Sequence, residues 1–259
     1  MNLIDTHAHI YLDAFDDDRD AMLARAFDAG VNTIILPNID RESLTPMKAL
    51  CRRYPKQLYP LAGLHPTSVK EDYVSQLEYI KKELDEGTYT GIGECGMDLY
   101  WDKTYLEQQK RAFAMQLTWS HELGLPIIIH IRDAFNEAFD VLESSGYQSF
   151  KGVFHCFSGT REDATRAVEM GFLLGIGGVV TFKKSNLPEI ISGIDPSKIL
   201  LETDSPFLAP VPYRGKRNEP SYIRLVAEKV ADIWGCSIAE AARITTENAT
   251  QLFNLENHG

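Results

Sequence analysis

Eight short runs rich in apolar and β-branched residues recur along the 259-residue chain at nearly even spacing. The first and last runs begin at residues 3 and 199, so the seven steps between them average 28 residues. That is the length of a strand plus a crossover helix. Most runs are apolar at successive positions, as parallel strands covered on both faces must be. The runs are Leu3–Ile10, Thr33–Ile39, Leu58–His65, Thr90–Met97, Pro126–Ile131, Gly152–Phe157, Phe172–Val180 and Ile199–Thr203.

The segments between these runs have helical patterns. Thr160 followed by Asp163 is typical of a helix start, because each side chain can bind the other residue's backbone N–H. After the last run, apolar residues return at helical spacing through residue 233. Ser237 with Glu240 then predicts the start of one more helix beyond the repeating units.

Eight strand-and-helix units in one chain close most economically into a barrel, which typically needs about 250 residues. A doubly wound sheet is the alternative, and it usually carries a glycine-rich phosphate loop after its first strand. Here the first run is followed by Tyr11, Leu12 and Asp13. The sequence therefore predicts an α/β fold: a single (β/α)8 TIM barrel domain over residues 1–259, with a short C-terminal helical extension.

The charge of the chain limits its partners. It has 26 Lys and Arg against 37 Asp and Glu, a formal net charge of −11. A broad basic surface for nucleic acid is absent, so phosphate groups must meet a local patch or bound metal. No apolar run reaches the roughly 18 residues of a membrane span. The four cysteines form no C-x-x-C pair, and the first residues lack the basic segment of a secretory signal. We expect a cytoplasmic protein without membrane contact and infer no obligate protein partner.

The residues with catalytic potential collect where the apolar runs stop. In a barrel of parallel strands, that end carries the active site. Of the seven histidines, five lie at such ends, whereas His121 is near a helix end and His258 is in a polar tail. The five are His7, His9, His65, His130 and His155.

Imidazoles and carboxylates together favour a divalent metal such as Zn, Mn or, with water, Mg. His7 and His9 can chelate one ion from a single strand. Asp204 ends the last strand, which neighbours the first after closure. His130 and His155 end two neighbouring strands and are expected to face the first pair across the barrel mouth.

Glu94 has two oxygens and can bridge two ions about 3.5–4 Å apart. Asp204 can orient water or accept its proton, so these two carboxylates are the predicted catalytic residues. Glu202 and Asp5 either orient ligand imidazoles from behind or form interior ion pairs with Arg132 or a lysine.

Six motifs in order carry a resemblance to a known family. They are DTHAH, GLHP, GECGMD, IHIRDA, HCFSG and ETDSPFLAPVPYRGKRNEP. From Asp5 to about Phe253 the chain resembles the TatD family of metal-dependent deoxyribonucleases, a branch of the amidohydrolase-like barrel superfamily. The resemblance implies two divalent ions. His7, His9, Glu94 and Asp204 would hold one, and Glu94, His130 and His155 the other.

The expected activity is hydrolysis of DNA phosphodiester bonds by a metal-activated water, with Mg, Mn or Zn as the metal. His65, Arg132, Arg214 and Arg217 are the predicted phosphate contacts, the last two from the densest basic stretch of the chain. The alternative is a C–N hydrolase, a deaminase or cyclic amidase on the same barrel. Many such two-metal enzymes bridge their ions with a carboxylated lysine on the fourth strand, where this chain has Glu94.

Aromatic residues close to the same run ends are a further candidate for substrate binding. They could stack on nucleic-acid bases or could anchor the loops that carry them. These residues are Tyr100, Trp101, Phe207 and Tyr213.

Overall fold

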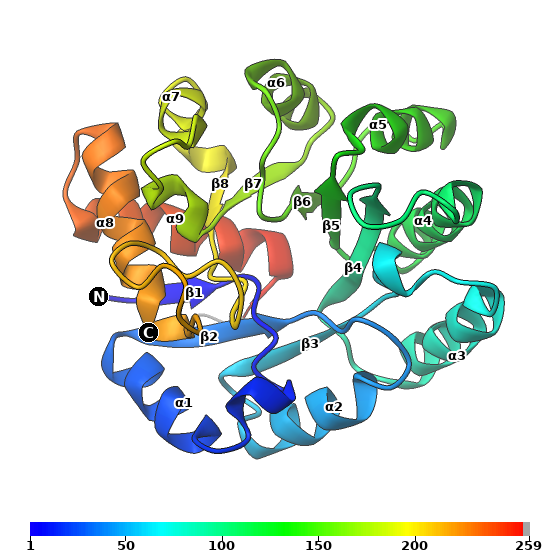
Figure 1. Ribbon diagram of the computed structural model, residues 1–259, viewed down its shortest axis with the longest axis horizontal. Coiled ribbons are helices and arrows are strands. Elements are labelled where there is room, and N and C mark those ends of the chain that lie inside the picture. The colour runs from blue at the N-terminus through cyan, green and yellow to red at the C-terminus, as the bar shows by residue number, and fades with distance from the viewer. Residues whose placement is uncertain (256–259) are drawn as a thin grey trace.

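The computed structural model describes residues 1–255 and shows one eight-stranded parallel sheet in sequential order, with helices around it (Figure 1). The strands are β1 (Leu3–Asp5), β2 (Val31–Leu36), β3 (Leu58–Ala62), β4 (Gly91–Asp98), β5 (Ile127–Arg132), β6 (Gly152–Phe154), β7 (Leu173–Ile176) and β8 (Ile199–Leu201).

Backbone hydrogen bonds beyond the strand ends join β8 to β1. The Thr6 N–H donates to the Leu201 carbonyl at 3.1 Å, and the Asp204 N–H donates to the His7 carbonyl at 2.8 Å. The His9 N–H then donates to the Ser205 carbonyl at 2.7 Å. The sheet is thus a nearly closed TIM barrel, which confirms the predicted fold class.

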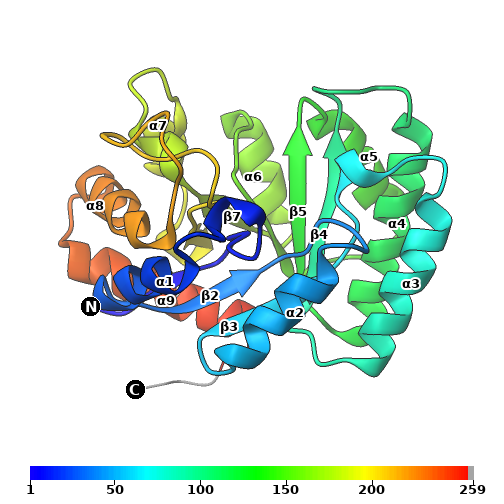
Figure 2. The ribbon, with the colours of Figure 1, turned by 60° about the horizontal axis from the view of Figure 1, so that its bottom comes forward.

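A helix follows every strand and packs on the outside of the barrel (Figures 1 and 2). The helices are α1 (Arg19–Asp28), α2 (Leu44–Arg53), α3 (Tyr73–Glu86), α4 (Leu106–Leu123), α5 (Phe135–Ser144), α6 (Arg161–Glu169), α7 (Leu187–Ile191), α8 (Ile223–Trp234) and α9 (Ile238–Phe253). Short 3-10 turns span Asp13–Phe15, Pro66–Ser68, Gly178–Thr181, Pro196–Lys198 and Pro220–Tyr222. Within residues 1–255, no helix combines the length and apolarity needed to cross a membrane.

The helix starts follow the predicted caps. The Thr160 hydroxyl accepts from the Asp163 N–H, and the Asp163 carboxylate accepts from the Thr160 N–H, which completes the capping box of α6. The Ser237 hydroxyl accepts from the Glu240 N–H at 3.2 Å and caps α9. The predicted C-terminal helical extension is therefore present.

Alternation along the strands divides the apolar side chains between two cores. On β5, Ile127 and Ile129 pack outward with the helices, whereas Ile128 points into the barrel. The next inward positions on this strand are His130 and Arg132. The inner core combines residues of six strands with the end of α9 and with Leu255 after that helix: Ile4, Ile35, Leu61, Ile128, Val153, Leu200, Ala249, Leu252, Phe253 and Leu255.

Helix α9 closes the barrel at the end opposite the functional residues. The Asn248 side chain donates to the carbonyls of Pro196 and Ile199, at the start of β8. The Thr246 hydroxyl donates to the Asn2 carbonyl, just before β1. Figure 1 shows α9, in red, lying behind the strands. The bottom of the barrel is thus apolar and plugged, and the polar inward positions lie toward the other end.

Several predicted strands end earlier in the structure. The run Leu3–Ile10 forms a strand only as far as Asp5, and Gly152–Phe157 only as far as Phe154. The residues after these ends leave the regular ladder but stay buried, except for the half-buried Cys156. Their backbones bind neighbouring chain ends instead, as His9 does with Ser205.

Truncating the plug should destabilise the barrel. Phe253 is 3% exposed within the inner core. We expect Phe253→Ala to lower the free energy of unfolding by about 3–5 kcal/mol, because the cavity left under the strands cannot fully collapse. Chemical denaturation measures the change. Gln251→Ala, on the exposed side of the same turn, is the control. A loss below about 1 kcal/mol for Phe253→Ala would show that α9 does not plug the core.

Candidate metal centre

The Glu94 carboxylate stands at the centre of the site, with a different pair of imidazoles at each of its oxygens. Oε2 lies 3.1 Å from His7 Nε2 and 3.3 Å from His9 Nε2. Oε1 lies 2.8 Å from His155 Nε2 and 3.0 Å from His130 Nδ1. Glu94 is 2% exposed. One buried carboxylate thus serves two separate nitrogen pairs from opposite sides of the barrel.

Asp204 completes the half of the site that His7 and His9 form. Its Oδ1 lies 3.8 Å from His7 Nε2 and 3.7 Å from His9 Nε2. The His7 ring also stacks on that of His155, with 3.8 Å between centroids. The structure therefore brings together all six residues that the sequence assigns to metal.

Neighbouring groups fix the proton positions on two of these histidines. The Tyr11 hydroxyl donates to the Pro37 carbonyl at 2.7 Å, so it accepts from His9 Nδ1 at 2.9 Å. The Asp98 carboxylate lies 2.9 Å from His130 Nε2 and can only accept when ionised. In the neutral rings, the lone pairs of His9 Nε2 and His130 Nδ1 therefore face Glu94.

This arrangement suits divalent metal. A bare imidazole nitrogen and a carboxylate oxygen repel each other at 3.0–3.3 Å unless a cation or a proton lies between them. The ligand atoms of His7, His9 and Glu94 all lie within 4.8 Å of one another, as do those of His7, His155 and Asp204. Imidazole nitrogen with carboxylate oxygen is a donor set that Zn and Mn accept.

The charges of the site depend on one another. Burial alone would raise the pKa of Glu94, but His155 and His7 beside it hold that pKa well below its usual value. Burial disfavours the charged form of His155, yet Glu94 and Glu202 hold the pKa of His155 well above normal. The pKa of His130 is likewise raised, against its burial, by Asp98 and Glu94. Glu94 is ionised, so the site attracts cations to its two oxygens.

The pKa of Asp204 is shifted in the opposite direction to that of Glu94. Burial raises the pKa of its carboxyl group to about 6, although His155 and His9 oppose the rise. Its side chain is 13% exposed, more than that of Glu94. A carboxylate with a pKa near neutrality, open to the mouth, is suited to accept a proton.

His65 lies beside the other imidazoles in a different tautomer. Its Nδ1 accepts from the Thr67 N–H at 3.2 Å and lies 2.7 Å from the Thr67 hydroxyl. A backbone N–H can only donate, so the proton of the neutral ring is on Nε2, which lies 3.3 Å from Glu94 Oε1. Burial lowers the pKa of His65 and favours this neutral form. His65 is therefore a hydrogen-bond donor toward the centre.

The two buried acids behind the site differ from each other. Glu202 Oε1 lies 3.4 Å from His155 Nδ1 and accepts from the Cys156 N–H at 2.5 Å. Asp5 instead accepts from the Thr203 N–H and hydroxyl and from the His7 N–H. Within residues 1–255 neither acid pairs with Arg132 or a lysine. Glu202 thus faces the His155 ring, whereas Asp5 holds the backbone between β1 and β8.

The arginines predicted to contact phosphate differ in whether a carboxylate of the described chain already binds them. The Arg132 guanidinium lies 3.6 Å over the Tyr100 ring, and no carboxylate of the described chain pairs with it. Arg214 is exposed and lies over the Phe182 ring at 4.5 Å. Arg217 is different: it binds both Asp18 oxygens, at 2.7 and 2.8 Å.

The assignment of Arg217 to substrate therefore needs correction. Its guanidinium also donates to the Ala14 carbonyl, so it anchors the loop after β8 to the start of α1. Tyr213 likewise stacks on Tyr222 at 4.3 Å and is a loop anchor, not an open stacking surface. Trp101 and Phe207 remain exposed at the mouth.

Two contacts of the site lie outside the sequence prediction. Asp98 orients His130, and Tyr11 orients His9. Asp98 is the last residue of β4 and of the motif that contains Glu94, so its place at a strand end was a usable signal. Tyr11 follows His9 by two residues, as His9 follows His7. The tyrosine, however, is also an ordinary core residue, and only the contact with Pro37 distinguishes it.

Comparison with known proteins identifies relatives of this chain over nearly its whole length. A family model described as "TatD related DNase" matches residues 4–254. "Uncharacterized metal-dependent hydrolase YabD" of Bacillus subtilis (strain 168) is 39% identical over 254 residues, which cover 98% of this chain and 99% of that protein. "3'-5' ssDNA/RNA exonuclease TatD" of Shigella flexneri serotype 5b (strain 8401) is 32% identical, with 98% and 99% covered.

A solved structure shows the same likeness. The crystal structure of YJJV, a TatD homolog from Escherichia coli k12, superposes with a TM-score of 0.92 at 30% sequence identity and covers 98% of each chain. The match extends over the barrel and its C-terminal helix together. The chain therefore belongs to the TatD family of metal-dependent hydrolases.

Proposed function

We propose that this protein is a nuclease that hydrolyses phosphodiester bonds of DNA with two divalent ions, and that Glu94 bridges them. The observation that carries the proposal is the division of Glu94 between two imidazole pairs. A bridging carboxylate between two ions is a recurring arrangement in enzymes that cleave phosphate esters. Relatives named as single-stranded DNA and RNA exonucleases support this substrate class.

Each oxygen of Glu94 would belong to one set of metal ligands. His7, His9, Asp204 and Glu94 Oε2 would hold one ion, and His130, His155 and Glu94 Oε1 the other. When bound, the ions would make water nucleophilic near neutral pH and neutralise charge on the phosphoryl oxygens.

The other residues act on the substrate and on protons. Asp204, whose side chain is more exposed than that of Glu94, would accept a proton from the attacking water. His65 presents Nε2–H as a neutral donor to a phosphoryl oxygen, a role that its bond from Thr67 preserves. Arg132 has its guanidinium held flat on Tyr100 and its N–H groups free for a phosphate.

One assay matrix tests this function. Metal-stripped protein is tested on single-stranded DNA, duplex DNA, RNA, bis(p-nitrophenyl) phosphate and a dihydropyrimidine-type amide, with Mg²⁺, Mn²⁺ or Zn²⁺ added back. We expect metal-dependent cleavage of DNA and of the small phosphodiester. Hydrolysis of the amide without cleavage of either phosphodiester would overturn the proposal in favour of a C–N hydrolase.

The bridging role can be tested by replacing one ligand oxygen. Glu94→Gln removes the negative charge shared by both ion sites but keeps the shape of the side chain. We expect loss of at least one ion per chain and a fall in hydrolysis of about 10²–10³-fold or more. Metal content by mass spectrometry and circular dichroism are measured together with activity. Full metal content with full activity would contradict the bridge.

Asp98 should control metal binding through His130. Asp98→Asn removes the negative charge beside His130 Nε2. The amide oxygen can keep the bond from the Tyr100 N–H, which turns the NH2 group toward His130 Nε2. That nitrogen must then accept, so the ring proton moves to Nδ1 and the lone pair no longer faces Glu94. We expect metal affinity to weaken about 10- to 100-fold, as for other residues that orient a ligand from behind. Asp85→Asn, an exposed change on α3, is the control. Equal affinities for the two variants would remove Asp98 from this role.

The loop after β8 should bind the nucleic-acid backbone through Arg214 and Lys216. Neutralising both should flatten the dependence of log K on log salt by about 0.7 per lost contact on single-stranded DNA. The control is Lys81→Ala with Lys82→Ala on α3, which changes the net charge equally. Arg217→Ala should instead lower thermal stability, because it releases Asp18. The same slope in the loop variant and the control would mean that the loop only carries solvated charge.

A further inference from the structure

The loops that follow β7 and β8 form one continuous surface at the mouth of the barrel. The Val211 N–H donates to the Thr181 hydroxyl at 2.9 Å, and the Arg214 guanidinium lies 4.5 Å over the Phe182 ring. Figure 2 shows the loop after β8, in gold, crossing the same end of the molecule as the chain before α7. Charges on the two loops therefore act on the same bound molecule.

This surface carries exposed cations that pair with no carboxylate of residues 1–255. The acids that follow them in the chain already have partners. Glu189 lies 3.6 Å from Arg161, and Glu219 lies 2.6 Å from Arg25. In a chain with a net charge of −11, positive charge without an acid beside it is available to a ligand. The cations, here called the β7–β8 strip, are Lys183, Lys184, Arg214 and Lys216.

One end of the strip borders negative charge. Arg217, the neighbour of Lys216, binds Asp18 at 2.7 Å. Four of the six residues 13–18 are aspartates. A polyanion on the strip is therefore repelled at this end and attracted toward the two lysines after β7.

Phe207 connects the strip to the metal centre. Its ring is 51% exposed and lies 6.2 Å, centroid to centroid, from that of His9. Such a ring can stack on a base while the neighbouring phosphate lies at the centre. Leu208 and Val211, in the same loop, are 42% and 47% exposed and extend the apolar surface away from His9.

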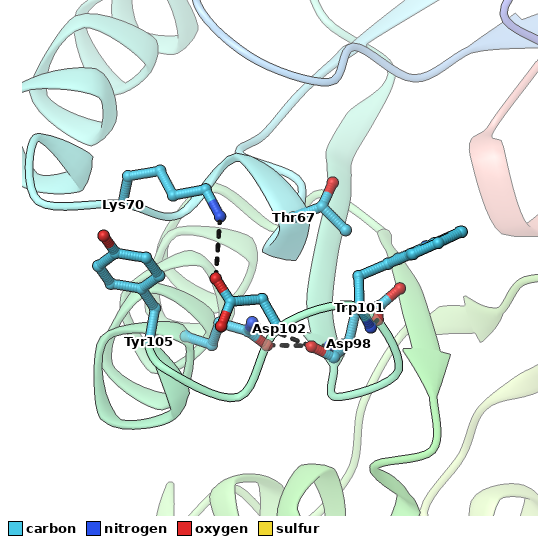
Figure 3. Close-up of a pocket in the computed structure, with 7 residues that line it drawn as sticks. Thr67, Lys70, Asp98, Trp101, Asp102 and Tyr105 are labelled. Carbon is cyan, nitrogen blue, oxygen red and sulfur yellow. Dashed lines mark hydrogen bonds and ion pairs between the residues drawn. The ribbon is translucent and has the colours of Figure 1, made fainter.

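The rim across the mouth has no comparable run of one sign. β4 lies four strands from β8 in the closed sheet, and the loop after β4 forms this rim. Figure 3 shows Lys70 directed at Asp102, with Nζ 3.6 Å from Oδ2. Asp98 faces His130 Nε2 at 2.9 Å. The charges here thus alternate in sign, and they belong to Lys70, Glu71, Asp98, Asp102, Lys103, His130 and Arg132.

We propose that the β7–β8 strip holds the part of a nucleic-acid strand that lies several nucleotides away from the cleaved bond. The inference rests on the proposed nuclease function and adds a second binding surface, which recognises backbone phosphates without metal. The strand would pass from Glu94 over Phe207 to Lys183 and Lys184. A strand that reaches both surfaces binds more tightly than a short one, because the second contact is intramolecular. A lipid surface offers phosphates too, but only a strand also occupies the adjoining centre.

The test measures binding to metal-loaded protein as a function of strand length and salt. The probes are a dinucleotide and a single strand of about 16 nucleotides. Both have phosphorothioate linkages, which keep the negative charge and resist hydrolysis. Lys183→Ala with Lys184→Ala should weaken binding of the long strand about tenfold at low salt. The slope of log K against log salt should fall by about 1.4, or about 0.7 for each lost contact.

Two comparisons make the result specific to the strip. The dinucleotide is too short to span from the centre to the strip, so its affinity should be the same in the variant and the parent. Lys81→Ala with Lys82→Ala on α3 changes the net charge equally but removes lysines that pair with Asp85 and Glu86. That control should keep the parental slope for the long strand.

Combining variants tests whether both loops contact the same strand. Adding Lys183→Ala and Lys184→Ala to the variant that lacks Arg214 and Lys216 should lower the slope by about 2.8 in total. A total equal to that of the Arg214 and Lys216 changes alone would place the β7 loop off the path and overturn the proposal.

The remaining outcomes distinguish this inference from the proposed function. If no phosphodiester is hydrolysed with any metal, the nuclease function fails, and the strip fails with it as a substrate surface. If bis(p-nitrophenyl) phosphate and DNA are hydrolysed but the Lys183 and Lys184 variant binds the long strand with the parental slope, only the strip is overturned. Binding to phosphatidylglycerol vesicles that needs both lysines, with strand binding unchanged, would assign the strip to lipid and also overturn it.

Discussion

The site depends on one buried anion. Glu94 has lost nearly all its hydration, and an isolated carboxylate at that depth would be protonated. Its pKa is nevertheless held well below the usual value, chiefly by His155 and His7 beside it. Imidazoles from β5, from the end of β6 and from the segment after β1 surround its two oxygens. These rings come from parts of the chain up to about 150 residues apart. Only a closed barrel, in which every strand ends at the same mouth, brings them to one carboxylate. The opposite, apolar end can then be filled by α9 without competing for polar groups.

The hydrogen bonds that close the barrel between β8 and β1 also position residues of the proposed metal site. The strands proper end at Leu201 and Asp5, and the hydrogen bonds that join them lie beyond those ends. The Asp204 N–H binds the carbonyl of His7, so two ligands of one proposed ion sit on directly bonded backbones. Asp5 strengthens this seam by accepting from Thr203, with a pKa raised by burial to about 8. A change that opened the seam would move two ligands together and would not only weaken the sheet.

The sequence was sufficient for the barrel and for the inward residues because both follow from periodicity. Spacing of about 28 residues predicts the units, and alternation on β5 places His130 above Ile128. The sequence pattern does not predict contacts between residues that are far apart in the chain. Arg217 is basic and lies in the right loop, yet its partner Asp18 comes from the start of the chain. Asp98 and Tyr11 act through the second nitrogen of a ring, and nothing in the local pattern specifies which nitrogen faces the centre.

The acidic character of the chain has a physical consequence at the mouth. A protein with a net charge of −11 repels a polyanion at long range, so binding must come from short-range contacts. Under the proposed function, such contacts would come from Arg132 on the Tyr100 ring, from Arg214 on the loop after β8 and from ions at Glu94. Salt screens long-range repulsion but not stacking or metal coordination. For this molecule, moderate salt therefore weakens the repulsion and the loop contacts together. If the proposed function holds, the recognition that survives at high salt would be carried by the metal centre and the exposed ring of Trp101.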